Sequence, residues 1–125
     1  MNNKAKILYV DDEAINLTLF EINFKQHYDV YTAENGSKGL EILKENPDTL
    51  IIVSDMKMPG MNGIEFIKKA KEQFPNKKYF ILTGFEINDE ITHAIESGLI
   101  IKYFRKPFNI KDIQSSIDSA IAQCN

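Results

Sequence analysis

The sequence has little cysteine, little arginine and no long hydrophobic run, and each shortage excludes a class of protein. Cys124 is the only cysteine, so no disulfide can form within the chain, which is typical of proteins in a reducing cytoplasm. Arg105 is the only arginine among 15 basic residues, and a net charge of -3 gives no reason to expect binding to nucleic acid or to an anionic membrane. No apolar run approaches the ~20 residues of a membrane span, and the N-terminus lacks a signal-peptide pattern. We therefore expect a cytoplasmic protein.

A single domain over residues 1–125 is the expected organisation. The length of 125 residues is near the common domain size, and a hydrophobic fraction of 43% with a charged fraction of 26% is ordinary for a globular protein. No repeat, low-complexity tract or linker divides the chain, and a second domain would not fit in this length.

Segments typical of strands and of helices alternate along the whole chain. The expected strands are short apolar or β-rich runs at residues 7–10, 29–33, 50–53, 79–82 and 99–104. Helical periodicity lies between them, over residues 14 to about 26, through Leu40 and Leu43, over 62–75 and 87–98, and from about 110 to 121. Right-handed crossovers then favour a doubly wound parallel five-stranded sheet, (βα)5, with helices on both faces and strand order 2-1-3-4-5.

Local signals predict details of three helices. The inner face of the first helix is expected to consist of apolar residues at helical spacing, namely Ile15, Leu19 and Ile22, widened by Phe20 and Phe24. Asn62, with Glu65 three residues later, predicts a capping box at the start of the third helix. Gly98 is expected to close the fourth helix.

Polar side chains follow four of the expected strands at the points where those strands end. They are Asp11 and Asp12, Asp55, Thr83, and Lys106. The carboxyl ends of parallel strands share one edge of the sheet, and ligands bind at the switch point between the first and third strands. Each group taken alone has an ordinary explanation, such as an acidic helix start, a strand-end threonine or a solvated lysine. Their joint arrangement is specific, and it predicts a metal-assisted phosphoryl site.

The chemistry of this predicted site depends on a cation. Carboxylates crowded at one edge repel each other unless a cation neutralises them, and Mg²⁺ is favoured because it bridges to phosphate oxygens, with Mn²⁺ as a substitute. Asp55 is the candidate nucleophile, since a carboxylate can accept a phosphoryl group to form an acyl phosphate. Thr83 can donate to a phosphoryl oxygen, Gly84 lets the backbone approach closely, and Lys106 can pair with the phosphoryl charge. The bond between Lys106 and Pro107 is a candidate for the cis form.

Four motifs in order resemble those of the receiver domain of bacterial two-component response regulators, including single-domain chemotaxis regulators. They are residues 7–13 (ILYVDDE), 54–63 (SDMKMPGMNG), 82–84 (LTG) and 106–108 (KPF), and the resemblance covers essentially the whole chain. It implies a flavodoxin-like fold and a phosphorylation-driven signalling switch, not a turnover enzyme. Self-phosphorylation and autodephosphorylation are the only reactions that it implies.

The resemblance also implies roles for individual residues. Asp55 would accept a phosphoryl group from a histidine kinase or a histidine phosphotransfer protein, and Thr83, Gly84 and Lys106 would bind the phosphoryl oxygens. The implied magnesium ligands are Asp11, Asp12, Asp55 and the backbone carbonyl of Lys57.

Switching is expected at the surface of the fourth helix, fifth strand and fifth helix, which is also a candidate homodimer interface. Thr83 would move toward the phosphoryl group and Tyr103 would turn inward behind it, although a half-buried strand tyrosine without a switching role explains Tyr103 equally well. Lys57 and Phe85 flank the site at positions that influence phosphate lifetime in receivers, and a cation and an aromatic there predict slow loss of phosphate.

Three other functions stay open on the sequence alone. A Mg²⁺-dependent phosphohydrolase of the haloacid-dehalogenase type would also use Asp55 as nucleophile, but it would carry a second aspartate where Lys57 stands. A binding module that works without phosphorylation fits the same fold, although such modules have usually lost an acidic residue or the lysine. Flavodoxin-like cofactor binding is disfavoured because no loop rich in Thr and Ser follows the first strand. The sequence does not identify the kinase or the output.

Overall fold

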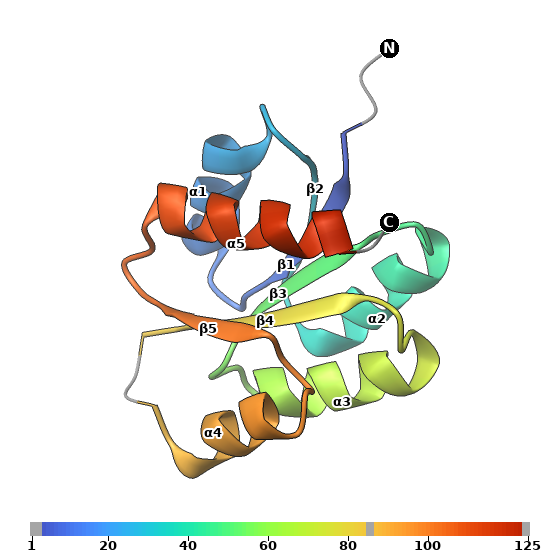
Figure 1. Cartoon of the computed structure of the whole chain (residues 1–125), viewed down its shortest axis with the longest axis vertical. Coiled ribbons are helices and arrows are strands. Elements are labelled where there is room, and N and C mark those ends of the chain that lie inside the picture. Colours follow the sequence, from blue (N-terminus) through green and yellow to red (C-terminus); the bar gives the residue numbers. More distant parts are fainter. Residues whose placement is uncertain (1–3, 85–86, 124–125) are drawn as a thin grey trace.

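The computed structural model describes residues 4–84 and 87–123, and within them strands and helices alternate strictly (Figure 1). The elements are β1 (Lys6–Val10), α1 (Ala14–Phe24), β2 (Asp29–Ala33), α2 (Gly36–Glu45), β3 (Ile51–Asp55), α3 (Gly63–Gln73), β4 (Lys78–Thr83), α4 (Asp89–Glu96), β5 (Lys102–Arg105) and α5 (Ile110–Gln123). All four strand pairings are parallel, and the order is β2-β1-β3-β4-β5. The predicted (βα)5 architecture is confirmed.

Helices cover both faces of the sheet. Figure 1 shows α1 and α5 on one face and α2, α3 and α4 on the other. Successive residues of β1 alternate between the two cores: Ile7 and Tyr9 join the cluster under α1 and α5, whereas Leu8 and Val10 join the other. Because these four side chains are almost completely buried, β1 has no polar face over residues 7–10, as expected for an inner strand of a doubly wound sheet.

The inner face of α1 differs from the prediction. Ile15, Leu19 and Ile22 are 67%, 45% and 56% exposed, whereas Phe20 and Phe24 are fully buried. The ring of Phe20 stacks on Tyr9 with centroids 4.2 Å apart. Aromatic rings bury more area than aliphatic side chains, so the two phenylalanines determine which side of α1 packs on the sheet. The prediction that the three aliphatic residues face the core is wrong.

The connection into β5 also differs from the prediction. The strand was expected over residues 99–104, but β5 begins only at Lys102. The backbone N–H groups of Leu99 and Ile100 both donate to the carbonyl of Ala94, so this segment closes the end of α4 before the strand starts. Gly98 has a φ of +80°, which favours glycine and confirms its predicted role in ending the helix. At its other end α4 starts at Asp89, with Asn88 as cap, rather than at residue 87.

The start of α3 fixes the end of β3. The predicted capping box is present: the Asn62 side chain accepts from the Glu65 N–H at 2.9 Å, and the Glu65 carboxylate accepts from the Asn62 N–H at 2.9 Å. A Cβ atom at Gly63 would lie 2.3 Å from the carbonyl oxygen of Asp55, so only glycine allows this close approach. The N-terminus of α3 thus packs directly against the residue that ends β3.

None of the described helices is long and apolar enough to cross a membrane. Cys124 and Phe85, which entered the sequence analysis, lie outside the residues that the structure describes.

Candidate functional site

Three carboxylates meet at the carboxyl edge of the sheet. One oxygen each from Asp11, Asp12 and Asp55 lies within 4.8 Å of the others. Asp11 follows β1 and Asp55 ends β3, and these two strands are hydrogen-bonded neighbours, so the expected switch point brings the residues together. Asp11 and Asp55 are buried, whereas Asp12 is exposed. Two of the three carboxylates are therefore largely removed from solvent.

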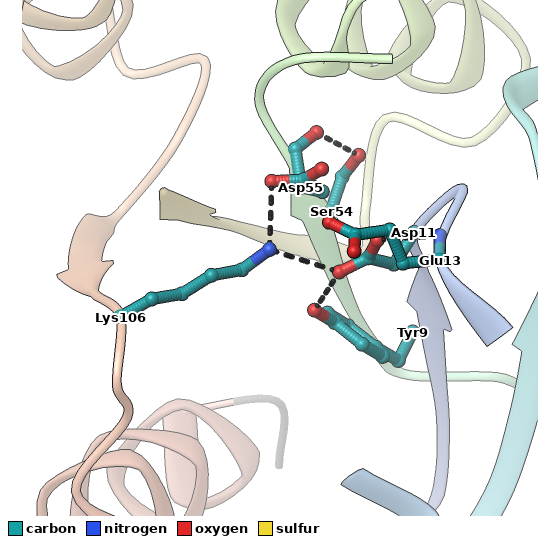
Figure 2. Close-up of polar contacts among 6 residues, drawn as sticks. All are labelled: Tyr9, Asp11, Glu13, Ser54, Asp55 and Lys106. Carbon is teal, nitrogen blue, oxygen red and sulfur yellow. Dashed lines mark hydrogen bonds and ion pairs between the residues drawn. The ribbon is translucent and has the colours of Figure 1, made fainter. Parts of the chain in front are cut away.

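Lys106 joins the two buried carboxylates. Its Nζ lies 3.0 Å from Asp11 Oδ2 and 3.1 Å from Asp55 Oδ1 (Figure 2). The side chain is 22% exposed and reaches the acidic cluster from the end of β5. Its backbone N–H donates to the carbonyl of Thr83 at 2.8 Å, which ties the ends of β4 and β5 together. The bond between Lys106 and Pro107 is cis, as the sequence suggested.

Asp11 has two further donors, and the sequence analysis found neither. The Tyr9 hydroxyl donates to Asp11 Oδ2 at 2.5 Å, and the backbone N–H of Glu13 donates to Oδ1 at 3.0 Å (Figure 2). Tyr9 was interpreted only as part of an apolar strand. The signal available in the sequence is its spacing, because residues two apart along an extended chain point to the same face.

The charges of the cluster are unbalanced. Burial, followed by the charge of Asp11, raises the pKa of Asp55 from 3.8 to about 6, although Lys106 acts in the opposite direction. Burial lowers the pKa of Lys106, but hydrogen bonding to Asp11 and the charges of both carboxylates outweigh this effect, and the pKa is raised. Burial, and then the bond to Asp11, raise the pKa of the Tyr9 hydroxyl, which therefore stays protonated as a donor.

An open cleft of about 460 Å³ lies over Asp55. It is lined by Asp12, Glu13, Asn16, Asp55, Lys57, Gly84 and Lys106. Thr83 is buried at the end of β4, next to Gly84. Tyr103 is half-buried in β5 and packs against the hydrophobic core on the face of the sheet that α4 covers. Among the residues that the structure describes, those predicted for the site thus lie in or beside the cleft except Tyr103, which lies three residues along the chain from Lys106.

The donor set suits a hard divalent cation. Three carboxylate oxygens close together are the ligand type that Mg²⁺ prefers. Burial, and then the charge of Asp11, raise the pKa of Asp55 even with Lys106 beside it, and a bound cation would relieve the repulsion between the carboxylates. The residues therefore fit Mg²⁺.

Fold and site together define a class of protein: a doubly wound α/β domain whose acidic cleft, with an inserted lysine, suits metal-assisted phosphoryl chemistry. The model of the response regulator receiver domain matches residues 7–118, and the chain belongs to this family. Phosphorylation on an aspartate is the general function of these domains in two-component signalling, they bind Mg²⁺ at an acidic pocket, and they are typically not enzymes. They interact with histidine kinases or phosphotransfer proteins.

Individual relatives show the same likeness. The chain is 39% identical over 114 residues to sporulation initiation phosphotransferase F of Bacillus subtilis, covering 90% of each chain. It is 27% identical over 120 residues to a chemotaxis protein CheY homolog of Campylobacter jejuni, covering 93% of this chain and 92% of the homolog. A crystal structure of a response regulator receiver domain from Clostridium thermocellum superimposes with a TM-score of 0.85 at 31% identity, covering 95% of each chain. Other relatives are longer, and the chain spans between 22% and 33% of their length.

Proposed function

We propose that Asp55 accepts a phosphoryl group from a histidine kinase or a histidine phosphotransfer protein in a Mg²⁺-dependent reaction. One observation carries this proposal: the Asp55 carboxylate lies in an open cleft, in contact with Lys106 and beside two further carboxylates. A carboxylate oxygen of Asp55 attacks the phosphorus, the bond from phosphorus to the donor nitrogen breaks, and that nitrogen keeps the electron pair.

The surrounding residues have separate roles in this proposal. Asp11, Asp12, Asp55 and the backbone carbonyl of Lys57 hold Mg²⁺, or Mn²⁺ in its place, and the ion screens the charge of the incoming phosphoryl oxygens. Lys106 pairs with a phosphoryl oxygen once Asp55 has reacted, because its ammonium already contacts both buried carboxylates. Thr83 and the backbone at Gly84 contact the other oxygens, since Thr83 ends the neighbouring strand β4 and Gly84 follows it.

The wider proposal concerns the whole chain. Residues 1–125 form one receiver unit that works in the cytoplasm and whose only reactions are its own phosphorylation and dephosphorylation. Phosphorylation shifts the surface of α4, β5 and α5, with Thr83 and Tyr103 as the residues that move, and this surface controls a partner, an effector domain or a second copy of the chain. Neither nucleic acid nor membrane is a proposed partner.

The test of the phosphoacceptor is intact mass after incubation with Mg²⁺ and acetyl phosphate, a donor that needs no partner protein. We expect the wild type to gain one phosphoryl group, and we expect no gain in Asp55→Ala or after chelation of Mg²⁺. A folded wild-type protein that gains no mass from acetyl phosphate or from any kinase, and does not bind beryllofluoride, would instead favour a binding module that works without phosphorylation.

The exposed apolar residues of α1 suggest where the phosphodonor docks. A groove of about 300 Å³ lies beside the cleft and is mainly apolar, with Leu19, Phe108 and Ile110 in its lining. Asn16 and Lys106 line both the groove and the cleft. A protein seated on this groove and on Ile15 therefore covers the entrance to Asp55. We propose that the phosphodonor binds there, because its histidine must reach Asp55 through that entrance.

A double variant tests the docking surface. Ile15→Ser with Leu19→Ser should slow phosphotransfer from a phosphorylated donor protein by at least about tenfold, since buried interface anchors often contribute more than 1 kcal/mol each. Phosphorylation by acetyl phosphate should stay unchanged. The control is Ile101→Ser. Ile101 is an exposed apolar residue like Ile15 and Leu19, with 46% of its surface accessible, but it lies just before β5 and not on α1. Equal rates of protein phosphotransfer in the double variant and the wild type would contradict this surface.

A further inference from the structure

We propose that the Tyr9 hydroxyl is a positioning group for metal binding: it holds the Asp11 carboxylate in the orientation that binds Mg²⁺. This inference rests on the proposed function only in taking Asp11 as a metal ligand. The observation behind it is the hydrogen bond of 2.5 Å from the Tyr9 hydroxyl to Asp11 Oδ2, at the point where β1 enters the cleft (Figure 2).

The donors around Asp11 leave its carboxylate little freedom. Oδ2 accepts from the Tyr9 hydroxyl and from Lys106 Nζ, and Oδ1 accepts from the backbone N–H of Glu13. A carboxylate has about four acceptor positions, so three are filled in the described structure and about one is left for a metal. Asp11 is fully buried, which keeps solvent from replacing any donor that is lost. Removing one donor therefore frees the carboxylate to rotate.

Packing alone does not account for the hydroxyl of Tyr9. Tyr9 is 1% exposed, and its ring stacks on Phe20 with an interplanar angle of 15°, a contact that phenylalanine would make equally well. Burying a hydroxyl in an aromatic cluster is unfavourable unless it has a hydrogen-bond partner, and Asp11 is that partner. The hydroxyl of Tyr9 thus hydrogen-bonds the carboxylate of Asp11, whereas the ring packs in the hydrophobic core.

The Tyr9→Phe variant isolates the contribution of this oxygen. It keeps the ring and its stacking, and removes only the donor to Asp11. Partners that orient metal ligands are commonly worth 10-fold to 100-fold in metal affinity, and we expect the dissociation constant for Mg²⁺ to rise about tenfold. Lys106 still contacts Asp11, so the carboxylate keeps part of its orientation.

Tyr28→Phe is a matched control. The Tyr28 hydroxyl also donates to a carboxylate at 2.5 Å, that of Asp118 on α5, and its side chain is 3% exposed. It packs in the same apolar cluster as Tyr9 but lies just before β2 begins, at the edge of the sheet opposite the acidic cleft. Removing its hydroxyl should loosen the fold comparably without changing the metal site.

The experiment is a titration of each folded protein with Mg²⁺ alone, followed by backbone amide chemical shifts, with acetyl phosphate kinetics at saturating Mg²⁺ as a second readout. The proposal predicts a tenfold weaker Mg²⁺ affinity in Tyr9→Phe only, and a phosphorylation rate at saturating Mg²⁺ within about threefold of the wild type. An affinity within twofold of the wild type, a tighter affinity, or equal weakening in Tyr28→Phe overturns it. Because the titration needs no phosphoryl donor, it decides the role of Tyr9 even if Asp55 proves not to be the acceptor.

Discussion

Asp55→Asn is expected to abolish phosphorylation and, without metal, to make the protein more stable than the wild type. Burial and the charge of Asp11 raise the pKa of Asp55 from 3.8 to about 6 in the folded protein. Ionised Asp55 is therefore less favourable in the fold than in the unfolded chain, and a pKa difference of this size corresponds to about 3 kcal/mol. Asparagine has a similar shape and carries no charge, so it removes the repulsion with Asp11.

The gain in stability of Asp55→Asn over the wild type should increase as the pH rises. Between about pH 4 and pH 6 the unfolded chain loses the Asp55 proton while the folded protein retains it, so the contribution of Asp55 to stability falls as the pH rises. The advantage of Asp55→Asn should then be near zero at pH 4 and reach about 2 to 3 kcal/mol at pH 7. Saturating Mg²⁺ should reduce the difference, because the ion binds the wild-type folded state and stabilises it by mass action.

Urea unfolding in the presence of a chelator, followed by circular dichroism at pH 4 and pH 7, measures this difference. The control is Asp48→Asn: Asp48 is an exposed aspartate whose pKa is lowered by its hydrogen bond with Lys6. Removing that carboxylate should leave the stability at pH 7 unchanged or slightly reduced, whereas Asp55→Asn should increase it. If Asp55→Asn is no more stable than the wild type at pH 7, the acidic cluster is not a source of instability in the metal-free protein.

The strand order and the polar edge could be predicted from the sequence because both depend on local patterns. Four apolar runs end in Asp11, Asp55, Thr83 and Lys106, and a parallel sheet brings such ends to one edge. The ion pairs of Lys106 with Asp11 and Asp55 follow from that topology. The structure extends these strands beyond the predicted ends at residues 53 and 82, so that Asp55 and Thr83 are the last residues of β3 and β4 instead of residues that follow them.

The orientation of α1 and the start of β5 could not be predicted in the same way. Apolar residues lie on several sides of α1, so the buried side depends on what the helix meets, here the ring of Tyr9 against Phe20. Leu99 and Ile100 have strand-like side chains, but their N–H groups bond to Ala94 at the end of α4. In both cases a contact with another element decides between structures that the local sequence permits equally.

The second large effect is expected for Lys106→Met, which removes the ammonium but keeps most of the side-chain stem. Lys106 Nζ pairs with two carboxylates that are 0% and 6% exposed, and removing one partner of a buried ion pair commonly costs 3 to 5 kcal/mol. We expect the metal-free protein to lose about 3 kcal/mol of stability at pH 7, since Asp55 can take up a proton and limit the loss. Lys102→Met is the control, because Lys102 begins β5, the strand that precedes Lys106, but its Nζ pairs with the exposed Asp112 and contacts Ser116 and the ring of Phe104, away from the buried carboxylates.

Metal binding and phosphorylation should respond to Lys106→Met in opposite directions. Mg²⁺ affinity should rise by about tenfold, because a neighbouring positive charge no longer opposes the ion. The rate of phosphorylation by acetyl phosphate at saturating Mg²⁺ should fall at least ~100-fold. The variant lacks the positioned ammonium that stabilises the negative charge of the phosphoryl oxygens during transfer. Tighter Mg²⁺ binding with an unchanged phosphorylation rate would show that Lys106 only balances the acidic cluster and does not bind the phosphoryl group.

The double variant Asp55→Asn with Lys106→Met separates the two contributions of the lysine to stability. In the Asp55→Asn background Lys106 has lost one of its two ion-pair partners, but its ammonium still forms the ion pair with the buried carboxylate of Asp11. The loss caused by Lys106→Met should therefore be smaller than in the wild type without vanishing, and the difference measures the coupling between Lys106 and Asp55. Additive effects would mean that Lys106 is held by Asp11 alone, and that its contact with Asp55 contributes nothing to the metal-free fold.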